Sequence, residues 1–441
     1  MINNYIFKFN QNVEILLREK KFSKFLRRQV LLIGLLYCGD YIFFFFEQNY
    51  FNTYIDHVLN LPEIYISLMV SLSATMGLIM NFVWGVFSDN TRSKFGRRRP
   101  YLLLGMIAGT AMIFYGLSPS FYICLFIDVI IIGIFSNAYL VAERSLIPDT
   151  VEIEKRGRAN GIINAVSYIG LLVGVAFLLV GNELFGVQDP IDGGTIITQE
   201  GHFILLSVGG IIFGLVGLIG FIFIKEKPIS ELPEKKPFLK ELKNSFNLRE
   251  FKAQKEFYKI TLAFMVFQSG ISSVMPFLFV FIFDLGLSTI ELLTVIAVAF
   301  PILYGVTLYL GKVADKFGRK RFIPLSIILT SIGYLIVPFT VSGNNVNFVL
   351  FIVIFPFIMV GLLALVTPLN TWTQDLLPED RRGTFNGIFN IVFTVSQVIG
   401  SIAGGIVATL FGVQWIFLLG PVFFIASIPL FLKVEETLKK D

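Results

Sequence analysis

The chain has 441 residues; 55% of them are hydrophobic, 15% are charged, and the mean hydropathy is +0.75. Soluble domains average about 25% charged residues, and no soluble core could bury this much apolar surface. The composition therefore excludes an ordinary soluble protein and predicts a chain that lies in a lipid bilayer. The formal net charge of +5 suits an anionic lipid surface and gives no reason to expect nucleic acid as a partner.

Long apolar segments recur along the chain and predict twelve membrane helices. A membrane helix needs about 20 mostly apolar residues to cross the hydrocarbon core, and it satisfies its own backbone polar groups. The segments are too long for strands of a membrane barrel, which need only ~9–11 residues. The predicted spans are residues 29–48, 64–87, 100–117, 121–142, 159–181, 202–224, 258–283, 287–310, 322–340, 346–368, 385–410 and 413–432.

The basic residues alternate between loops as twelve spans require. Lys and Arg gather in the cytoplasmic loops of membrane proteins. Of the 36, 35 lie before the first span, after the last, or in the loops that follow spans 2, 4, 6, 8 and 10; Lys259 stands at the start of the seventh span, and the other loops have none. We therefore expect a multi-pass protein of the cell membrane with both termini in the cytoplasm. Residues 1–27 contain no cleavable signal peptide; they form a cytoplasmic segment that lies on the inner leaflet or is solvated.

A charged phrase occurs twice, as GVFSDNTRSKFGRRRP (85–100) and as GKVADKFGRKR (311–321). Gly85 and Gly311 are 226 residues apart, and the same offset relates Gly157 to Gly383. We therefore expect two copies of a six-helix bundle, residues 28–224 and 258–433. A polar cytoplasmic linker, 225–257, joins them, and a cytoplasmic tail, 434–441, follows the second. Two parallel membrane repeats with a site between them is a plan used by transporters.

The repeated phrase resembles the signature loop of the major facilitator superfamily, Gly-x-x-x-Asp-Lys/Arg-x-Gly-Arg-Lys/Arg-Lys/Arg, which stands between helices 2 and 3 and again between helices 8 and 9. Both copies occupy those positions here. The resemblance implies an all-α membrane protein with twelve transmembrane helices in two pseudo-symmetric six-helix bundles. It also implies transport by alternating access, with spans 1, 4, 7 and 10 lining the central cavity.

We expect the charged phrases to form a conformational latch on the cytoplasmic side. Gly85 would let the second span approach a neighbour closely. Asp89 would accept hydrogen bonds from the N-terminal amides of a neighbouring helix, or pair with a cation of the other half. The alternative is a plain positive-inside anchor, which explains the arginines but not the spacing of Gly and Asp. The expected latch residues are Gly85, Asp89, Gly96, Arg97, Arg98, Gly311, Asp315, Gly318 and Arg319, with Arg381 and Arg382 as partners of Asp89, and Arg156 and Arg158 as partners of Asp315.

The first copy is longer between its Asp and its second Gly, and this spelling resembles the sucrose–proton symporters and the melibiose-permease branch of the glycoside–pentoside–hexuronide:cation symporters. CGDYIFFFF (38–46) is similar to the first helix of that branch, which implies that Asp40 binds sugar. RSLIPDTV (144–151) resembles its phrase after helix 4. The branch places two carboxylates on helix 2 as a sodium site, but the matching positions here hold Gly77 and Asn81. The sodium site is therefore expected to be absent, which favours a proton as the coupling ion.

Polar side chains inside the spans are the candidate site residues, because ionisable groups at bilayer depth are costly. Asp128 in the fourth span is the expected proton-coupling acid and Asp40 the expected sugar ligand, and the reverse assignment stays open. Glu47 and Asp284 are expected at the outer ends of their spans, in contact with solvent. Further candidate substrate ligands, which have the alternative role of bonding neighbouring helices, are Asn81, Asn137, Gln268 and Gln397.

Three functions are compatible with this pattern. The first is a symporter of a sugar or glycoside with a cation, and the second is a carrier for a drug, an organic acid or another metabolite, with or without coupling. A strongly anionic cargo would require Arg or Lys in the cavity, and the predicted spans contain none there. The third, a membrane-embedded enzyme, is not expected, because His57 and His202 fall in or near outer loops and no catalytic cluster is evident. We expect no cofactor and no metal, and a monomer as the transport unit.

Overall fold

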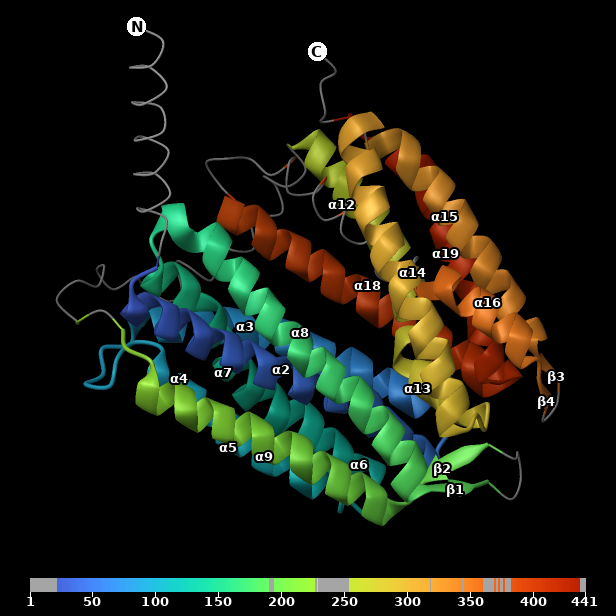
Figure 1. Cartoon of the computed structure of the whole chain (residues 1–441), viewed down its shortest axis with the longest axis horizontal. Helices are drawn as coiled ribbons and strands as arrows, with labels where there is room; N and C mark the ends of the chain where they lie inside the picture. Colours follow the sequence, from blue (N-terminus) through green and yellow to red (C-terminus); the bar gives the residue numbers. More distant parts are fainter. Residues whose placement is uncertain are drawn as a thin grey trace, which may run out of the picture.

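The computed structural model describes residues 22–189, 194–226, 228, 254–317, 319–342, 345–359, 369, 372, 376 and 382–436. Helices dominate these residues, and they form two groups, one from each half of the chain (Figure 1). The predicted linker lies almost entirely outside the described residues, as does most of residues 1–27.

The first half contains six membrane-spanning segments, two of which are built from consecutive helices. Their elements are α2 (Lys24–His57), α3 (Ile64–Asn90), α4 (Arg99–Leu102), α5 (Leu104–Tyr115), α6 (Phe121–Leu125), the π-helix η1 (Phe126–Ile132), α7 (Gly133–Thr150), α8 (Ile153–Phe185) and α9 (Gln199–Phe223). A short antiparallel hairpin, β1 (Gly186–Gln188) and β2 (Thr195–Ile197), connects α8 to α9. Side-chain oxygens cap two of these helices: Ser23 accepts from the backbone N–H of Leu26, and Thr198 from that of Gly201.

The second half repeats the arrangement. Its elements are α12 (Lys255–Ser272), the 3₁₀-helix η3 (Met275–Phe277), α13 (Leu278–Asp284), α14 (Thr289–Phe317), α15 (Arg319–Ile336), the 3₁₀-helix η4 (Val337–Thr340), β3 (Val341–Ser342), β4 (Asn345–Val346), α16 (Phe348–Met359), α18 (Arg382–Phe411), the 3₁₀-helix η7 (Val413–Trp415) and α19 (Ile416–Phe431). The seventh span is interrupted between α12 and α13, where Pro276 stands in η3. Proline has no backbone N–H and therefore cannot continue the helical hydrogen bonds.

The predicted fold class is confirmed. Nine helices in the described part of the chain are long and apolar enough to cross a membrane, and three shorter apolar helices fall on the remaining predicted spans: Arg99–Tyr115, Thr289–Ala299 and Phe348–Ile358. Each of the twelve predicted spans thus coincides with a helix. Several helices continue past their predicted ends, among them α2 to His57, α7 to Thr150 and α14 to Phe317.

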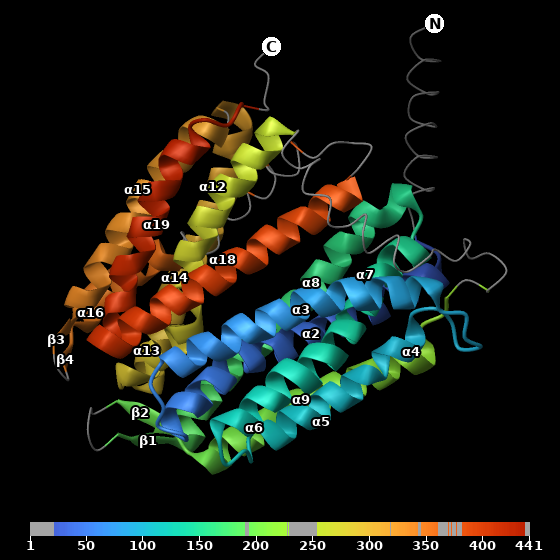
Figure 2. The same ribbon diagram turned by 180° about the vertical axis from the view of Figure 1, so that it is seen from behind.

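The two halves meet at one end of the molecule, which we call the hairpin end because it carries β1 and β2. From there the helices diverge toward the end where α2 begins and α19 ends, which we call the terminal end (Figures 1 and 2). The hydrogen bonds between the halves, within the described residues, lie toward the hairpin end. They include Asn52 Nδ2 to Pro276 O at 2.8 Å, Ile64 N to Thr409 Oγ1 at 2.9 Å, Ser67 Oγ to Ser401 O at 2.7 Å, and Ser71 Oγ to Ser401 Oγ at 2.8 Å. The conformation is closed at the hairpin end.

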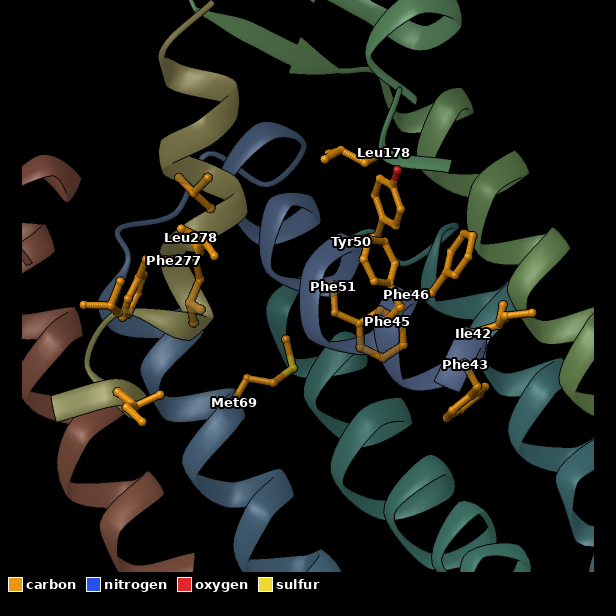
Figure 3. Packing of buried hydrophobic residues seen from close by; sticks show 14 of the residues in the cluster. Ile42, Phe43, Phe45, Phe46, Tyr50, Phe51, Met69, Leu178, Phe277 and Leu278 are labelled. Carbon is orange, nitrogen blue, oxygen red and sulfur yellow. The ribbon is translucent and has the colours of Figure 1, made fainter. Parts of the chain in front are cut away.

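Aromatic side chains of α2 build the core at this end. Figure 3 shows Phe45, Phe46 and Tyr50 of α2, with Phe277 of the second half to one side. The ring of Phe45 meets that of Phe279 in the second half edge-on, with centroids 5.4 Å apart, and the Tyr50 hydroxyl donates to a backbone carbonyl of α8 at 2.7 Å. Edge-to-face rings and a satisfied phenol are favourable in an apolar core, so α2 is held from both halves.

Candidate substrate and coupling site

Asp40 of α2 lies beside Glu143 and Arg144 of α7, close enough for the charges to interact. We call these three residues the α2–α7 cluster. Arg144 is exposed, Asp40 is partly buried, and Glu143 is fully buried at 0% exposed. The cluster therefore combines two carboxylates and one guanidinium, and two of its members, Glu143 and Arg144, lie in the part of α7 that was predicted to be loop.

The cluster corrects two inferences from the sequence. The fourth span was predicted to end at residue 142, which left Glu143 unnoticed and assigned Arg144 to a cytoplasmic loop. In the structure the helix continues to Thr150, so Arg144 lies within a helix and its charge acts on Asp40. The helical spacing of buried residues in α7, at Tyr139, Glu143 and Leu146, is a signal that could have revealed this: an i, i+4, i+7 pattern continues through the charged residues.

Tyrosines flank the α2–α7 cluster. Tyr37 and Tyr41 of α2 and Tyr139 of α7 are all near enough to Glu143 and Asp40 for electrostatic interaction. Tyr41 is 38% exposed, and its neighbour Tyr168 of α8 is 57% exposed. Exposed phenol rings beside carboxylates offer a flat apolar face together with hydroxyl groups.

Asp128 lies in the π-helix η1 and is 3% exposed. Ser73 of α3 is a hydrogen-bond partner of its carboxylate, whereas its Oδ1 atom has no partner among the described residues. Glu47 of α2 is near enough for its charge to interact with that of Asp128. π-helical turns occur frequently at functional sites because the extra residue redirects a side chain, and here the redirected segment carries the acid.

The position of Glu47 differs from the expectation. It was expected at the outer end of the first span, in contact with solvent. Because α2 continues to His57, Glu47 instead lies well inside the helix and is partly buried. The aromatic residues that follow it, such as Tyr50 and Tyr54, extend the helix without extending the apolar run, so hydropathy ended the span too early.

Asn81 and Asn137 are brought together by α3 and α7. The Asn81 Nδ2 donates to Asn137 Oδ1 at 2.9 Å and to the Gly77 carbonyl at 2.8 Å, while the Asn137 Nδ2 donates to the Gly133 carbonyl at 2.8 Å. Both donors of Asn81 are therefore used within the protein. This is the alternative role of amides that bond neighbouring helices, and it joins α3 to α7.

Gln268 and Gln397 lie in the second half, on α12 and α18. Gln268 is 7% exposed, and Gln397 is partly buried. Their helices pack closely, since a side chain at Gly400 of α18 would collide with the backbone of Ser269 on α12. The two amides remain candidates for contacts from the second half.

The first charged phrase forms an ion-pair network within its own half. Arg98 binds Asp89 and also Asp149 at the end of α7, with its Nε 3.0 Å from the Asp149 Oδ2. Arg97 contacts both oxygens of Asp149 at 2.7 Å. Asp89 thus pairs with Arg98 of its own loop. Its expected pairing with Arg381 or Arg382 falls on side chains outside the described residues and stays a prediction.

The two glycines of this phrase have different roles. Gly96 has φ +115°, and a Cβ there would lie 2.6 Å from an oxygen of Glu226. Glu226, which follows α9, accepts hydrogen bonds from the backbone N–H groups of Arg97, Arg98 and Arg99 at 2.7–2.9 Å. Gly85 has nothing within 4 Å of where its Cβ would stand, so the expected close approach at Gly85 is not made in this conformation.

The second charged phrase is described only in part. Gly311, Asp315, Arg319 and Arg382 lie within helices, but their side chains are outside the described set, and Gly318 and Arg381 are outside it altogether. One contact matches the first half: the backbone N–H of Lys320 donates to Glu436, after α19, at 2.8 Å. Of the expected partners of Asp315, Arg156 donates to backbone carbonyls of Pro148 and Val151, and Arg158 stacks over the ring of Phe22.

The two histidines lie at the hairpin end, near helix ends as expected: His57 is the last residue of α2, and His202 lies in the first turn of α9. His202 of α9 is 0% exposed and hydrogen-bonds Thr53 at 3.0 Å. His57 lies beside Asp56 and Asp284, with one ligand atom of each within 4.8 Å of the others. Its Nδ1 accepts the backbone N–H of Ile197 at 3.0 Å, so a neutral ring carries its proton on Nε2, facing the two acids. That tautomer suits a hydrogen-bond donor and disfavours Nε2 as a metal ligand.

Comparisons with known proteins identify the family. The family model described as Major Facilitator Superfamily matches residues 30–396 and 296–441. The chain is 26% identical over 278 residues to the multi-drug resistance efflux pump PmrA of Streptococcus pneumoniae, covering 62% of each chain; it thus spans about three fifths of that relative's length. It is 29% identical over 121 residues to the general alpha-glucoside permease of Schizosaccharomyces pombe, covering 23% of this chain and 20% of the permease.

Solved structures share the fold. A bacterial homologue of the human lysosomal transporter Spinster, in an inward-facing and unoccupied conformation, aligns with a TM-score of 0.71 at 16% identity, over 93% of this chain and 97% of that one. The nucleoside transporter NupG aligns with a TM-score of 0.68 at 13% identity, over 93% and 99%. Since the family model matches more than half of the sequence and the fold agrees, the chain belongs to the major facilitator superfamily of membrane transporters.

Proposed function

We propose that this secondary transporter carries a sugar or glycoside together with a proton, by alternating access. The α2–α7 cluster is the observation that supports this most directly. A carboxylate and a guanidinium side by side accept from and donate to neighbouring hydroxyl groups, and the exposed rings of Tyr41 and Tyr168 can cover the C–H face of a sugar ring. In this proposal Asp40 and Arg144 bind the sugar hydroxyls.

A proton is the proposed coupling ion. The positions that would carry a sodium-binding pair of carboxylates hold Gly77 and Asn81, and Asn81 is bonded to Asn137. Asp128 is the proposed coupling acid, because an ionised carboxylate with an unpartnered oxygen is costly in a low-dielectric interior. Glu47 lies near enough for its charge to interact with that of Asp128, so the charge state of one acid would affect the other.

The proposed orientation follows from the basic loops. The terminal end, which carries the Arg97 and Arg98 network, would face the cytoplasm of the cell, with both termini on that side. The hairpin end would then face outward, and this conformation would be closed to the outside. Residues 28–224 and 258–433 are the proposed rocking units, residues 225–257 the linker between them, and the monomer the proposed transport unit.

A second candidate function is the efflux of organic cations or drugs. The similarity to a multi-drug resistance efflux pump favours it, as does the presence of two acids and several tyrosines at one place, since aromatic faces and carboxylates attract organic cations. A membrane-embedded enzyme, the third class considered, gains no support from the family or the fold.

Uptake by proteoliposomes tests the proposal. Radiolabelled maltose, sucrose and melibiose would be offered with and without a pH gradient directed inward, in parallel with ethidium. Accumulation of a disaccharide that depends on the gradient supports sugar–proton symport. Gradient-dependent expulsion of ethidium without any movement of the three sugars overturns it in favour of efflux. Liposomes without the protein, tested with and without the same pH gradient, are the matched controls.

A further inference from the structure

Glu143 is the most completely buried acid among the residues described here. It is 0% exposed, and neither of its carboxylate oxygens has a hydrogen-bond partner. The backbone nearby offers no compensation, since Glu143 lies inside α7 where the amide groups are bonded along the helix. An ionised carboxylate in such a place is strongly disfavoured unless a cation pairs with it.

The charges around Glu143 do not supply that cation fully. The groups whose charges act on it come from α2 (Asp40, Tyr37 and Tyr41) and from α7 itself (Tyr139 and Arg144). In the described part of the chain, α3, α4, α5 and α8, which also pack against α7, bring no further ionisable group that acts on Glu143. Arg144 is thus a single cation that two carboxylates share, and it forms no direct ion pair with either of them within the described residues.

Burial decides between the two carboxylates. Asp40 is partly exposed, and the charge of Arg144 favours its ionised form. Glu143 is fully buried, and neither of its carboxylate oxygens has a partner atom. We infer that Glu143 carries a proton in the conformation closed at the hairpin end, and that it is a second proton-binding site of this transporter, separate from Asp128 and adjacent to the substrate ligand Asp40.

This site would couple the proton to the substrate through one guanidinium. While Glu143 is protonated, Arg144 is available to Asp40 and to a bound hydroxyl group. When Glu143 loses its proton, it requires Arg144 as a counter-ion, and the charge balance at Asp40 changes. The inference that Glu143 carries a proton depends on its burial and geometry alone, whereas the link between this proton and sugar binding rests on the proposed function.

Infrared spectroscopy of the purified protein in lipid nanodiscs tests the proton directly. A protonated carboxyl group gives a C=O band separate from those of carboxylates and amides, and ¹³C-labelled glutamate shifts the band of Glu143 but not those of Asp40 or Asp128. We expect Glu143→Gln to remove part of the glutamic acid band and Glu143→Asp to restore a band that the label no longer shifts. Glu152→Gln, which changes an exposed acid on the neighbouring segment, is the matched control and should leave the spectrum unchanged.

Two outcomes would overturn the inference. One is a wild-type spectrum without any glutamic acid band that the label shifts; this measurement requires no variant to fold. The other is a Glu143→Gln spectrum identical to that of the wild type.

Transport of radiolabelled maltose tests the link to the substrate. In Glu143→Gln, maltose accumulation driven by the pH gradient should fall at least tenfold. Maltose counterflow should remain, because exchange involves no net proton movement. Wild-type accumulation in this variant would refute the coupling role. If the wild type moves no maltose, the sugar proposal fails, while the infrared result still decides whether Glu143 holds a proton.

Discussion

Arg97 binds Asp149 through one nitrogen, Nη2, which lies 2.7 Å from each carboxylate oxygen. Arg98 holds the same carboxylate through Nε, so one acid at the end of α7 fixes two cations of the loop before α4. Both arginines are almost buried, at 8% and 4% exposed. A buried guanidinium is tolerated only when it is paired, which makes Asp149 a condition for the fold of this loop.

Replacing Asp149 by Asn should therefore lower the free energy of unfolding by about 2 kcal/mol, because two buried guanidiniums lose a shared negative charge. The measurement is thermal unfolding in detergent. Glu152→Gln is the control: its side chain is 69% exposed and pairs with Lys155, so a change within about 0.5 kcal/mol is expected. Equal shifts in both variants would contradict the role given to Asp149.

Gly96→Ala should destabilise the same loop while Gly85→Ala should not. At Gly96 the backbone has φ +115° and a Cβ would stand 2.6 Å from the Glu226 carboxylate, so both strain and a clash follow, at a cost of about 1–3 kcal/mol. At Gly85 the same methyl group meets no atom within 4 Å. The unfolding midpoints of the two variants give the comparison, and a stable Gly96→Ala would show that the loop can move away from Glu226.

Hydropathy predicted the helices well because a span of lipid-facing residues is a local property of the sequence. Hydropathy failed where a helix continues beyond its apolar residues but stays inside the protein. Glu143 and Arg144 lie in such an extension of α7, and Glu47 lies just before the one of α2; there burial depends on neighbouring helices rather than on the residues themselves. The positions of the spans could thus be predicted from the sequence, whereas the buried charged residues of the site could not.

Partner choice was also beyond the sequence. The spacing of Gly85, Asp89 and Gly96 predicted that the charged phrase acts as a unit, but Asp89 had arginines on both halves available to it. The structure pairs it with Arg98, since the halves are apart at the terminal end. Likewise the sequence offered Asn81 and Asn137 as ligands or as helix-bonding amides, and only the relative rotation of α3 and α7 decides that they bond each other.

Asp128→Asn and Asp40→Asn should separate coupling from binding. The Asp128 variant is expected to lose accumulation driven by a pH gradient and to retain counterflow, because a neutral amide at this buried position cannot exchange a proton. The Asp40 variant should weaken substrate binding directly, by about tenfold or more, since a hydrogen bond to a charged group contributes ~1.5–3 kcal/mol. Counterflow and equilibrium binding of the transported sugar are the two measurements. If both variants still accumulate the sugar fully in response to a pH gradient, the transporter is not coupled to protons through these two acids.

Cysteine labelling should place the two ends of the molecule on opposite sides of the membrane. In a background with Cys38 and Cys124 replaced by Ser, Gln188→Cys in the hairpin should react with a membrane-impermeant maleimide added to intact cells. Lys225→Cys at the terminal end should react only after the cells are opened. Both positions are exposed, so accessibility within the protein is matched. The reverse pattern would invert the proposed orientation.

A disulfide across the hairpin end should stop transport reversibly. Ser71 of α3 and Ser401 of α18 belong to different halves, and their hydroxyl oxygens are 2.8 Å apart, a separation that suits a cross-link between cysteines at the two positions. Alternating access requires these helices to separate so that the site opens at the hairpin end. The oxidised Ser71→Cys/Ser401→Cys protein should therefore lose uptake, and a reductant should restore it. The single variant Ser71→Cys, treated with the same oxidant, controls for damage to other groups. Undiminished uptake by the cross-linked protein would mean that the hairpin end does not open during transport, and the rocking of the two halves would have to be abandoned as the mechanism.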